Sequence, residues 1–342
     1  MLPTIEFAIV QGDIFSFAAD ILALKYAQAF YGADSRLAYS LQGKGISIED
    51  LQPDIGAFRY VETFGYTRAG HALFVGVQRL TQFGYPEIRS FASKVLEGVN
   101  QYAPSAEHVC MTIHGVGYGL DEAEACRAEL EGCLDAIQGA QNKPFLPHLR
   151  TITIVDRDAS RVARLRSAID EYLSSGIGPA KVSKSATVGT YLIDTGSQIQ
   201  QLPGARGGAG SHNEPHIFVA MPFNTDMNDV FYYGIEAPVH ASGFLCERMD
   251  HIHFTGEIMD WMKRKIETAA LIIAEVSGAN PNVYLEVGYA WGKGRPTLLL
   301  ARNGVNLEFD AKGHRCIFYT GIKDLEDKII REIAELKAQN LI

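Results

Sequence analysis

Apolar residues in the second half of the chain gather in short runs separated by amphipathic segments. The runs are too short for buried helices and are typical of strands covered on both faces; they span 216–221, 244–249, 269–276, 296–301 and 316–320. Segments with helical spacing alternate with them, and the last closes the chain at 324–338. The pattern predicts a doubly wound parallel sheet, which right-handed crossovers favour in the flavodoxin-like order 2-1-3-4-5.

The first half has a less regular pattern. Strands are predicted at 5–10, 21–25, 72–77, 109–114 and 151–155, and helices at 86–102, 121–137 and 160–173. These elements predict a mixed α/β domain.

A change in composition at 183–215 separates the two halves. This segment has a Gly-rich run at 204–210 and no helical period, so it is predicted to be a linker, although residues 188–193 can add an edge strand to the first domain. The predicted organisation is a domain at 1–182, a linker at 183–215 and a domain at 216–342.

Composition narrows the classes of partner and compartment. The 342 residues can form two cores, and a net charge of −9 gives little attraction to nucleic acid or anionic lipid. No apolar run is long enough to span a membrane, and the N-terminus lacks the features of a signal peptide. Five cysteines without CxxC spacing indicate a reduced, cytoplasmic protein. No metal site is predicted, because His251 and His253 have no evident third ligand.

The predicted strand order places a ligand site between the strands that end at Met221 and Val276. Glu286 lies close to this switch point, in the first turn of a helix capped by Asn282. The helix dipole there favours an ionised carboxylate, which can act as a nucleophile or stabilise an oxocarbenium-like transition state. Acidic residues are also common in the first turn of surface helices, where they only compensate the helix dipole. The spacing alone does not decide whether Glu286 is catalytic or such a surface residue.

Four ordered blocks within 216–320 add a family resemblance. They contain AMPFNTDMNDVF, FTGEIMDWMKRKIETAALIIAEVSG, NPNVYLEVGYAWGKGRPTLLL and RCIFYTGIKDLEDKI. Together they resemble the nucleoside 2-deoxyribosyltransferase-like family and its TIR-like relatives from bacterial defence systems. The resemblance implies N-glycosidic chemistry with Glu286 as the catalytic acid. The strand-end acid is usually aspartate in such sequences and is Glu275 here, one methylene longer, which leaves its role open.

The same resemblance implies a set of substrate contacts around these acids. Met221, Pro222 and Phe223, in the turn after the first strand, would border the base and the ribose. Thr255 and Gly256, at a helix start, would contact a phosphate. Asn280 and Asn282 would bind ribose hydroxyls or stabilise the loop in which they lie. Tyr284 can stack on the base or simply belong to the core. The residues are Met221, Pro222, Phe223, Thr255, Gly256, Ser277, Asn280, Asn282 and Tyr284.

The first domain resembles a macro domain. Its opening, IEFAIVQGDIFSFAADILALKYA, resembles the first macro strands, and 70–113 is also similar to the macro-like domain of leucine aminopeptidases. The resemblance implies that Asp13 and Ile14 contact the adenine of ADP-ribose. It also implies that a Gly-rich loop wraps the diphosphate, although a plain tight turn explains such a loop equally well; its residues are Gly115, Gly117, Tyr118 and Gly119.

One departure from the macro pattern affects the expected activity. The Asn-rich segment that normally follows the second strand is LKYAQAFYG here, so the asparagine expected of ADP-ribose-removing enzymes is absent. Ligand sensing or assembly is therefore favoured over hydrolysis in this domain.

Together the resemblances imply a cytoplasmic, homo-oligomeric defence protein. The macro-like domain would sense a nucleotide, and the second domain would cleave the N-glycosidic bond of NAD, as a substrate and with no cofactor. One alternative is a nucleoside 2-deoxyribosyltransferase or hydrolase of salvage type. Another is a nucleotide receptor without turnover. The expected partner in each case is a small nucleotide, and neither nucleic acid nor membrane is expected.

Overall fold

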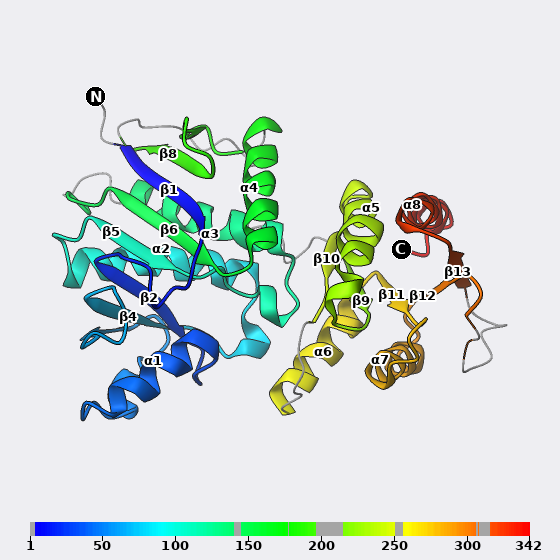
Figure 1. The fold of residues 1–342 in the computed structure, drawn as a ribbon, viewed down its shortest axis with the longest axis horizontal. Coiled ribbons are helices and arrows are strands. Elements are labelled where there is room, and N and C mark those ends of the chain that lie inside the picture. The colour runs from blue at the N-terminus through cyan, green and yellow to red at the C-terminus, as the bar shows by residue number, and fades with distance from the viewer. Residues whose placement is uncertain are drawn as a thin grey trace. The chain divides into compact units, whose positions relative to one another are not determined.

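The chain divides into two compact units in the computed structural model (Figure 1). The first contains residues 1–115 and 122–212, and the second contains residues 116–121 and 213–342. The structure describes residues 4–139, 145–176, 178–195, 215–249, 256–305, 307 and 315–342, except for the side chains of 256–258.

The first unit is built on an eight-stranded mixed sheet in the order β3-β4-β2-β5-β6-β1-β8-β7. The five central strands are parallel, whereas β3, β8 and β7 pair antiparallel with their neighbours. The strands are β1 (Thr4–Gln11), β2 (Ile21–Tyr26), β3 (Phe58–Glu62), β4 (His71–Gly76), β5 (His108–Met111), β6 (Thr151–Asp156), β7 (Val182–Lys184) and β8 (Thr190–Asp194). The predicted mixed α/β class is confirmed.

Helices cover both faces of this sheet (Figure 1). They are α1 (Gly32–Gln42), α2 (Tyr85–Tyr102), α3 (Glu122–Gly139) and α4 (Ala159–Ser174). Leu37 and Leu41 of α1 share a buried cluster with Leu24 and Phe74. On the opposite face, α2 approaches the sheet so closely that a Cβ on Gly98 would lie 2.8 Å from Leu73.

The structure has strands where the predicted linker begins, and one of them is the edge strand expected at 188–193. Residues 182–184 and 190–194 form β7 and β8, and β8 pairs with β1 over five residue pairs. Val182, Tyr191 and Ile193 are buried, so pairing with an available strand edge and apolar burial order these residues. The Gly-rich remainder, 196–214, lies outside the described residues.

The second unit has five strands in the order β10-β9-β11-β12-β13, all parallel. This is the predicted 2-1-3-4-5 order, so the flavodoxin-like doubly wound class is confirmed. Ile217 and Val219 face one buried cluster, and Phe218 and Ala220 face the other, as expected for strands covered on both sides. The strands are β9 (His216–Ala220), β10 (Leu245–Glu247), β11 (Leu271–Glu275), β12 (Thr297–Arg302) and β13 (Arg315–Tyr319).

The helices of the second unit differ from prediction in two places. They are α5 (Ala237–Ala241), α6 (Gly256–Thr268), α7 (Pro281–Gly292) and α8 (Ile322–Ala338). The single helix predicted after Thr225 is instead a 3-10 turn (Thr225–Met227), a π-helix (Val230–Glu236) and then α5. Pro238 has no N–H for an ordinary helical bond, and Ala237 just before it donates to the carbonyl of Tyr232, five residues back.

The second difference is that α7 begins earlier than predicted. The predicted cap was Asn282, but Asn280 caps the helix by accepting a 2.9 Å hydrogen bond from the Asn282 amide, and Pro281 is the first helical residue. Proline at this position is favoured because its missing N–H has no helical partner there. Glu286 therefore lies in the second turn rather than the first.

Two sequence-based expectations can be compared with the structure directly. Among the described residues, no helix combines the length and hydrophobicity needed to cross a bilayer. All five cysteines are free thiols, four of them buried.

We expect Gly132→Ala to destabilise the first unit. A Cβ on Gly132 in α3 would lie 2.1 Å from the Arg89 carbonyl oxygen of α2, so the two helices would have to move apart. The cost should be at least about 1–3 kcal/mol in the free energy of unfolding, measured by urea denaturation. Gly139→Ala is the matched control, since nothing lies within 4 Å of its Cβ position at the end of the same helix. Equal stability of the two variants would contradict the close approach of α2 and α3.

Candidate functional sites

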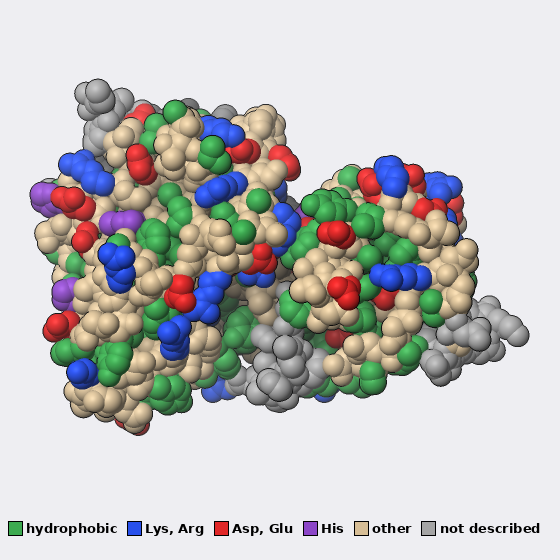
Figure 2. Space-filling view, in the orientation of Figure 1, with side chains coloured by type: hydrophobic (Ala, Val, Ile, Leu, Met, Phe, Trp, Pro, Cys, Tyr) green, Lys and Arg blue, Asp and Glu red, His purple; other side chains and the backbone are tan. Residues whose placement is uncertain are grey.

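The first unit has a pocket of about 410 Å³ at the carboxyl ends of β1, β5 and β6. This volume lies within the range of small-molecule sites, and the position is the usual one for ligands in α/β sheets. The residues that line it are Gly12, Ile14, Phe15, Gly32, Ala33, Arg36, Thr112, Val155, Asp156, Arg157, Asp158 and Arg161. Between α1 and α4, Figure 2 shows Lys and Arg side chains mixed with Asp and Glu.

The turn after β1 builds one wall of this pocket. Asp13 Oδ1 accepts a 2.8 Å hydrogen bond from the Phe15 amide, and Asp13 also pairs with Arg157. The Phe15 hydrogen bond and the smaller attraction of Arg157 hold the pKa of Asp13 below its ordinary value. Arg36 lies over the Phe15 ring, 4.1 Å from its centroid. Of the two residues expected to contact adenine, Ile14 lines the pocket, whereas Asp13 lies between the lining residues Gly12 and Ile14 in the chain.

Two helices begin at the pocket, and they differ in how their first amides are satisfied. The Asp158 carboxylate caps α4 and accepts hydrogen bonds from the Ser160 and Arg161 amides at 2.8 and 3.2 Å. At α1, by contrast, Tyr31 makes no side-chain cap, and the lining residues Gly32 and Ala33 supply the first two amides. First-turn amides have no partner within the helix, so the start of α1 is the better place for an anion.

The predicted diphosphate loop does not line this pocket. Only Gly115 of the four loop residues belongs to the first unit, whereas residues 116–121 group with the second. There Tyr118 accepts a 2.7 Å hydrogen bond from Trp261 Nε1, and a Cβ on Gly119 would lie 2.8 Å from Met249 Cγ. Gly117 lies in a 3-10 turn, Val116–Tyr118. Close packing at Gly119 is thus one use of this loop in the second unit, and its role as a diphosphate loop stays a prediction.

In the second unit, Glu286 is buried on the sheet-facing side of α7. Its side chain lies on the same stripe as Val283, Val287 and Ala290, which pack in the core. Burial raises the pKa of Glu286 from its ordinary value of 4.5 to about 8. Burial thus opposes the predicted ionised carboxylate, because loss of hydration outweighs the helix dipole in the second turn of α7.

The strand-end acid Glu275 is held by its neighbours. It is 1% exposed; Tyr319 donates a 3.1 Å hydrogen bond to its Oε1, and Ser277 donates a short one to the same atom. The Ser277 hydroxyl in turn accepts a 2.7 Å hydrogen bond from the Arg302 amide. These contacts join the ends of β11, β12 and β13. Glu275 and Ser277 were both predicted as site residues, and their hydrogen bonds stabilise the loops that follow β11, β12 and β13.

We expect Tyr319→Phe to destabilise the second unit, because the buried Glu275 carboxylate loses one of the two donors that the described residues supply. The free energy of unfolding should fall by about 1–2 kcal/mol in urea denaturation. Tyr233→Phe, which removes an exposed hydroxyl in the same unit, should change it by less than about 0.5 kcal/mol. If the two variants unfold alike, Glu275 does not depend on Tyr319.

The two switch-point loops lie side by side. A Cβ on Gly278 would lie 3.9 Å from Pro222 Cγ. Met221 is buried, whereas Phe223 is 50% exposed and has the Arg248 guanidinium 5.0 Å from its ring centroid. The structure therefore brings the predicted base-contacting turn and the loop before α7 together.

The other predicted substrate-contact residues differ in their surroundings. Asn280 serves as the α7 cap, Asn282 is exposed in the first turn, and Tyr284 packs against the buried cluster around Val283. Gly256 begins α6, as expected of a helix start. Thr255, His251 and His253 lie outside the described residues.

Sequence reasoning missed a group of potential metal ligands in the second unit. Asp121, Glu236 and His240 each offer one ligand atom, and the three atoms lie within 4.8 Å of one another. Glu236 and His240 are four residues apart, a spacing that puts side chains on one face of a helix, and this was the available signal. Asp121 lies more than a hundred positions away, and no sequence pattern links it to them.

Comparison with known proteins assigns no family. No family model and no curated protein matches the sequence. Similar solved structures include a macrodomain from Oceanobacillus iheyensis, with 10% identity over 50% of this chain and 100% of that one and a TM-score of 0.36. The macro domain of ganglioside induced differentiation associated protein 2 has 13% identity over 46% and 81%, with a TM-score of 0.34. The bottromycin maturation enzyme BotP has 14% identity over 92% and 89%, with a TM-score of 0.28. These similarities are too weak to bear on function.

Proposed function

We propose that the first unit binds a nucleoside diphosphate of the ADP-ribose type. The observation that carries this proposal is the pocket in which the uncapped start of α1 lies together with the Asp13 turn. A diphosphate would accept hydrogen bonds from the Gly32 and Ala33 amides and gain from the charge of Arg36. The macro-like motifs of the sequence support the same ligand class.

The Asp13 turn would contact the base. An adenine amino group is a hydrogen-bond donor, and the ionised Asp13 carboxylate is an acceptor beside the apolar Ile14 side chain. This pairing favours adenine over bases that present only an acceptor at the corresponding position. An acidic residue near an anion-binding pocket is also explained: Asp13 would accept a hydrogen bond from adenine, while the amides at the start of α1 would bind the phosphates.

Calorimetric titration of the purified chain tests the proposal. ADP-ribose should bind saturably with one site per chain. Adenosine, which lacks both phosphates, should bind at least tenfold more weakly, and inosine diphosphate ribose, with an acceptor in place of the amino group, should also bind more weakly than ADP-ribose. Equal binding of ADP-ribose and adenosine would contradict the role of α1.

A second function, N-glycosidic cleavage of NAD or a related nucleotide by the second unit, is favoured by Glu286. Burial alone accounts for the raised pKa of this acid, and no basic residue contributes to the shift among the described residues. An acid tied to an Arg or Lys would favour a receptor, whereas a buried acid with a perturbed pKa next to a switch point is typical of catalysis. The resemblance of residues 216–320 to deoxyribosyltransferase-like proteins supports this reaction class.

The positive charge of the nicotinamide ring of NAD would favour the ionised, reactive form of Glu286. A nicotinamide cation close to Glu286 favours the ionised carboxylate and so lowers the pKa of the acid. As the bond between ribose C1′ and the nicotinamide nitrogen breaks, its electron pair stays on nitrogen, and the carboxylate stabilises the cationic sugar. Water then adds to C1′ and loses a proton, giving ADP-ribose and nicotinamide. The first product is the ligand class proposed for the first unit.

A further inference from the structure

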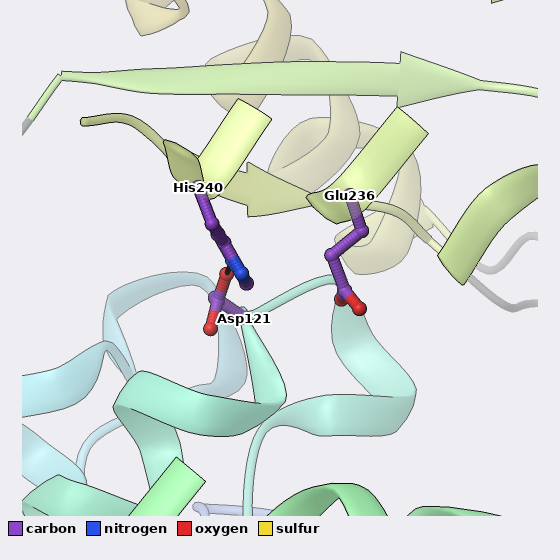
Figure 3. A group of neighbouring side chains, drawn as sticks. All are labelled: Asp121, Glu236 and His240. Atoms are coloured by element: carbon purple, nitrogen blue, oxygen red, sulfur yellow. Dashed lines mark hydrogen bonds and ion pairs between the residues drawn. The ribbon is translucent and has the colours of Figure 1, made fainter. Parts of the chain in front are cut away.

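A three-residue group in the second unit has the composition of a transition-metal site. Figure 3 shows Glu236 and His240 reaching from their helices toward Asp121. Glu236 is the last residue of the π-helix, and His240 lies in α5 one turn later. Asp121 is the last residue of the segment 116–121. One imidazole nitrogen and two carboxylates thus converge from two separate parts of the chain.

The geometry of the group is close to that of a bound ion. His240 Nε2 and Asp121 Oδ2 are 2.5 Å apart, and the three potential ligand atoms all lie within 4.8 Å of one another. Two ligands of tetrahedral zinc with bonds of about 2.0 Å are roughly 3.3 Å apart. The His240 side chain is 36% exposed, so a small rotation of its ring can open this separation.

Asp121 is held in place by a contact outside the group. Its carboxylate is 1% exposed, and Oδ2 accepts a 3.0 Å hydrogen bond from the Cys246 amide on β10. Hydrogen bonds of this kind orient metal-ligating carboxylates and help to select the bound geometry. The π-helix that ends at Glu236 is a rare element, and such elements occur frequently at functional sites.

We propose that Asp121, Glu236 and His240 bind a divalent transition-metal ion of the Zn²⁺ or Mn²⁺ class. The imidazole nitrogen argues against Mg²⁺ and Ca²⁺, which prefer oxygen ligands only. Three protein ligands leave one or more positions for water. The bound ion fastens residues 116–121 to α5 and β10 within the second unit. This inference does not depend on the nucleotide ligand of the first unit or on Glu286.

Equilibrium dialysis of the chelator-treated full chain against Zn²⁺, and separately against Mn²⁺, tests the site. Bound metal is measured by mass spectrometry. The wild type should bind one ion of at least one of the two metals at a site that His240→Gln weakens at least tenfold. His148→Gln is the matched control, because His148 is an exposed histidine outside the group, and it should bind like the wild type. The metal should also raise the thermal midpoint of the wild type but not that of His240→Gln.

Glu236→Gln repeats the test with a second ligand, in case His240→Gln does not fold as judged by circular dichroism. Loss of the bound ion in either folded variant supports the site. The proposal is overturned if the folded wild type binds neither metal, or if a folded ligand variant binds as tightly as His148→Gln.

Discussion

Glu286→Gln is expected to reduce NAD cleavage at least about a thousandfold and to stabilise the second unit at alkaline pH. The loss of activity follows because glutamine can neither carry the negative charge that stabilises the cationic sugar nor attack it. Cleavage is measured by chromatography and mass spectrometry of the nicotinamide released. Glu335→Gln, an exposed change of the same type on α8, is the control and should leave the rate unchanged.

The stability effect has a sign fixed by the direction of the pKa shift. The folded protein raises the pKa of Glu286 from 4.5 to about 8, so ionisation is harder in the folded state than in the unfolded state. The contribution of Glu286 to the free energy of unfolding therefore falls as pH rises from about 4.5 to about 8, by roughly 1.4 kcal/mol for each pH unit in that range. The Gln variant avoids this loss. Its thermal midpoint should exceed that of the wild type at pH 8.5 and match it near pH 4.5.

These two measurements separate the structural claim from the functional one. Equal midpoints at pH 8.5 would contradict the burial of the acid. A higher midpoint together with unchanged NAD cleavage would leave the burial intact and refute the catalytic role. A parallel assay with deoxynucleosides and a free base distinguishes transfer from hydrolysis, because only transfer yields the exchanged nucleoside.

Ala33→Glu is expected to weaken ADP-ribose binding at least about a hundredfold without unfolding the first unit. The new carboxylate would lie at the second position of α1, where it interacts favourably with the helix dipole, so the helix should persist. The same charge repels a diphosphate and competes for the amides that would bind it. Binding is measured by calorimetry and folding by thermal denaturation.

Ala163→Glu is the matched control for this change. It adds the same charge at an exposed position of α4, and Ala163 does not line the pocket. ADP-ribose affinity should then change by less than about threefold, as expected for a screened surface charge. If both variants lost affinity equally, the effect would be one of net charge, and the start of α1 would not be the phosphate site.

The second sheet could be predicted from the sequence because its strands carry their own signal. Residues such as Ile217, Phe218 and Val219 are apolar at every position, which only a strand buried on both faces requires. The first sheet was harder to complete. β3 is only partly buried and has no continuous apolar run, and β7 was not predicted, whereas β8 was expected as an edge strand at 188–193. These strands form because they pair with neighbouring strands, and the local sequence does not specify that pairing.

The sites were predictable only where one short segment builds them. The Asp13 turn and the switch-point loops lie next to strand ends, so their positions follow from the strand assignments. The raised pKa of Glu286 did not follow, because it depends on burial by elements distant in sequence. The uncapped start of α1 was missed for a similar reason: that helix was not predicted at all. NAD as the substrate and assembly into a homo-oligomer stay predictions.

The most direct test of the nucleotide site is hydrogen–deuterium exchange of the full chain with and without saturating ADP-ribose. The pocket predicts slower exchange at the amides of residues 12–15 and 32–36, because the ligand would cover the Asp13 turn and bind the first amides of α1. Residues 116–119 should exchange at the same rate in both samples. Protection at 116–119 with no change at 32–36 would contradict the site and restore the Gly-rich loop as the place where the diphosphate binds.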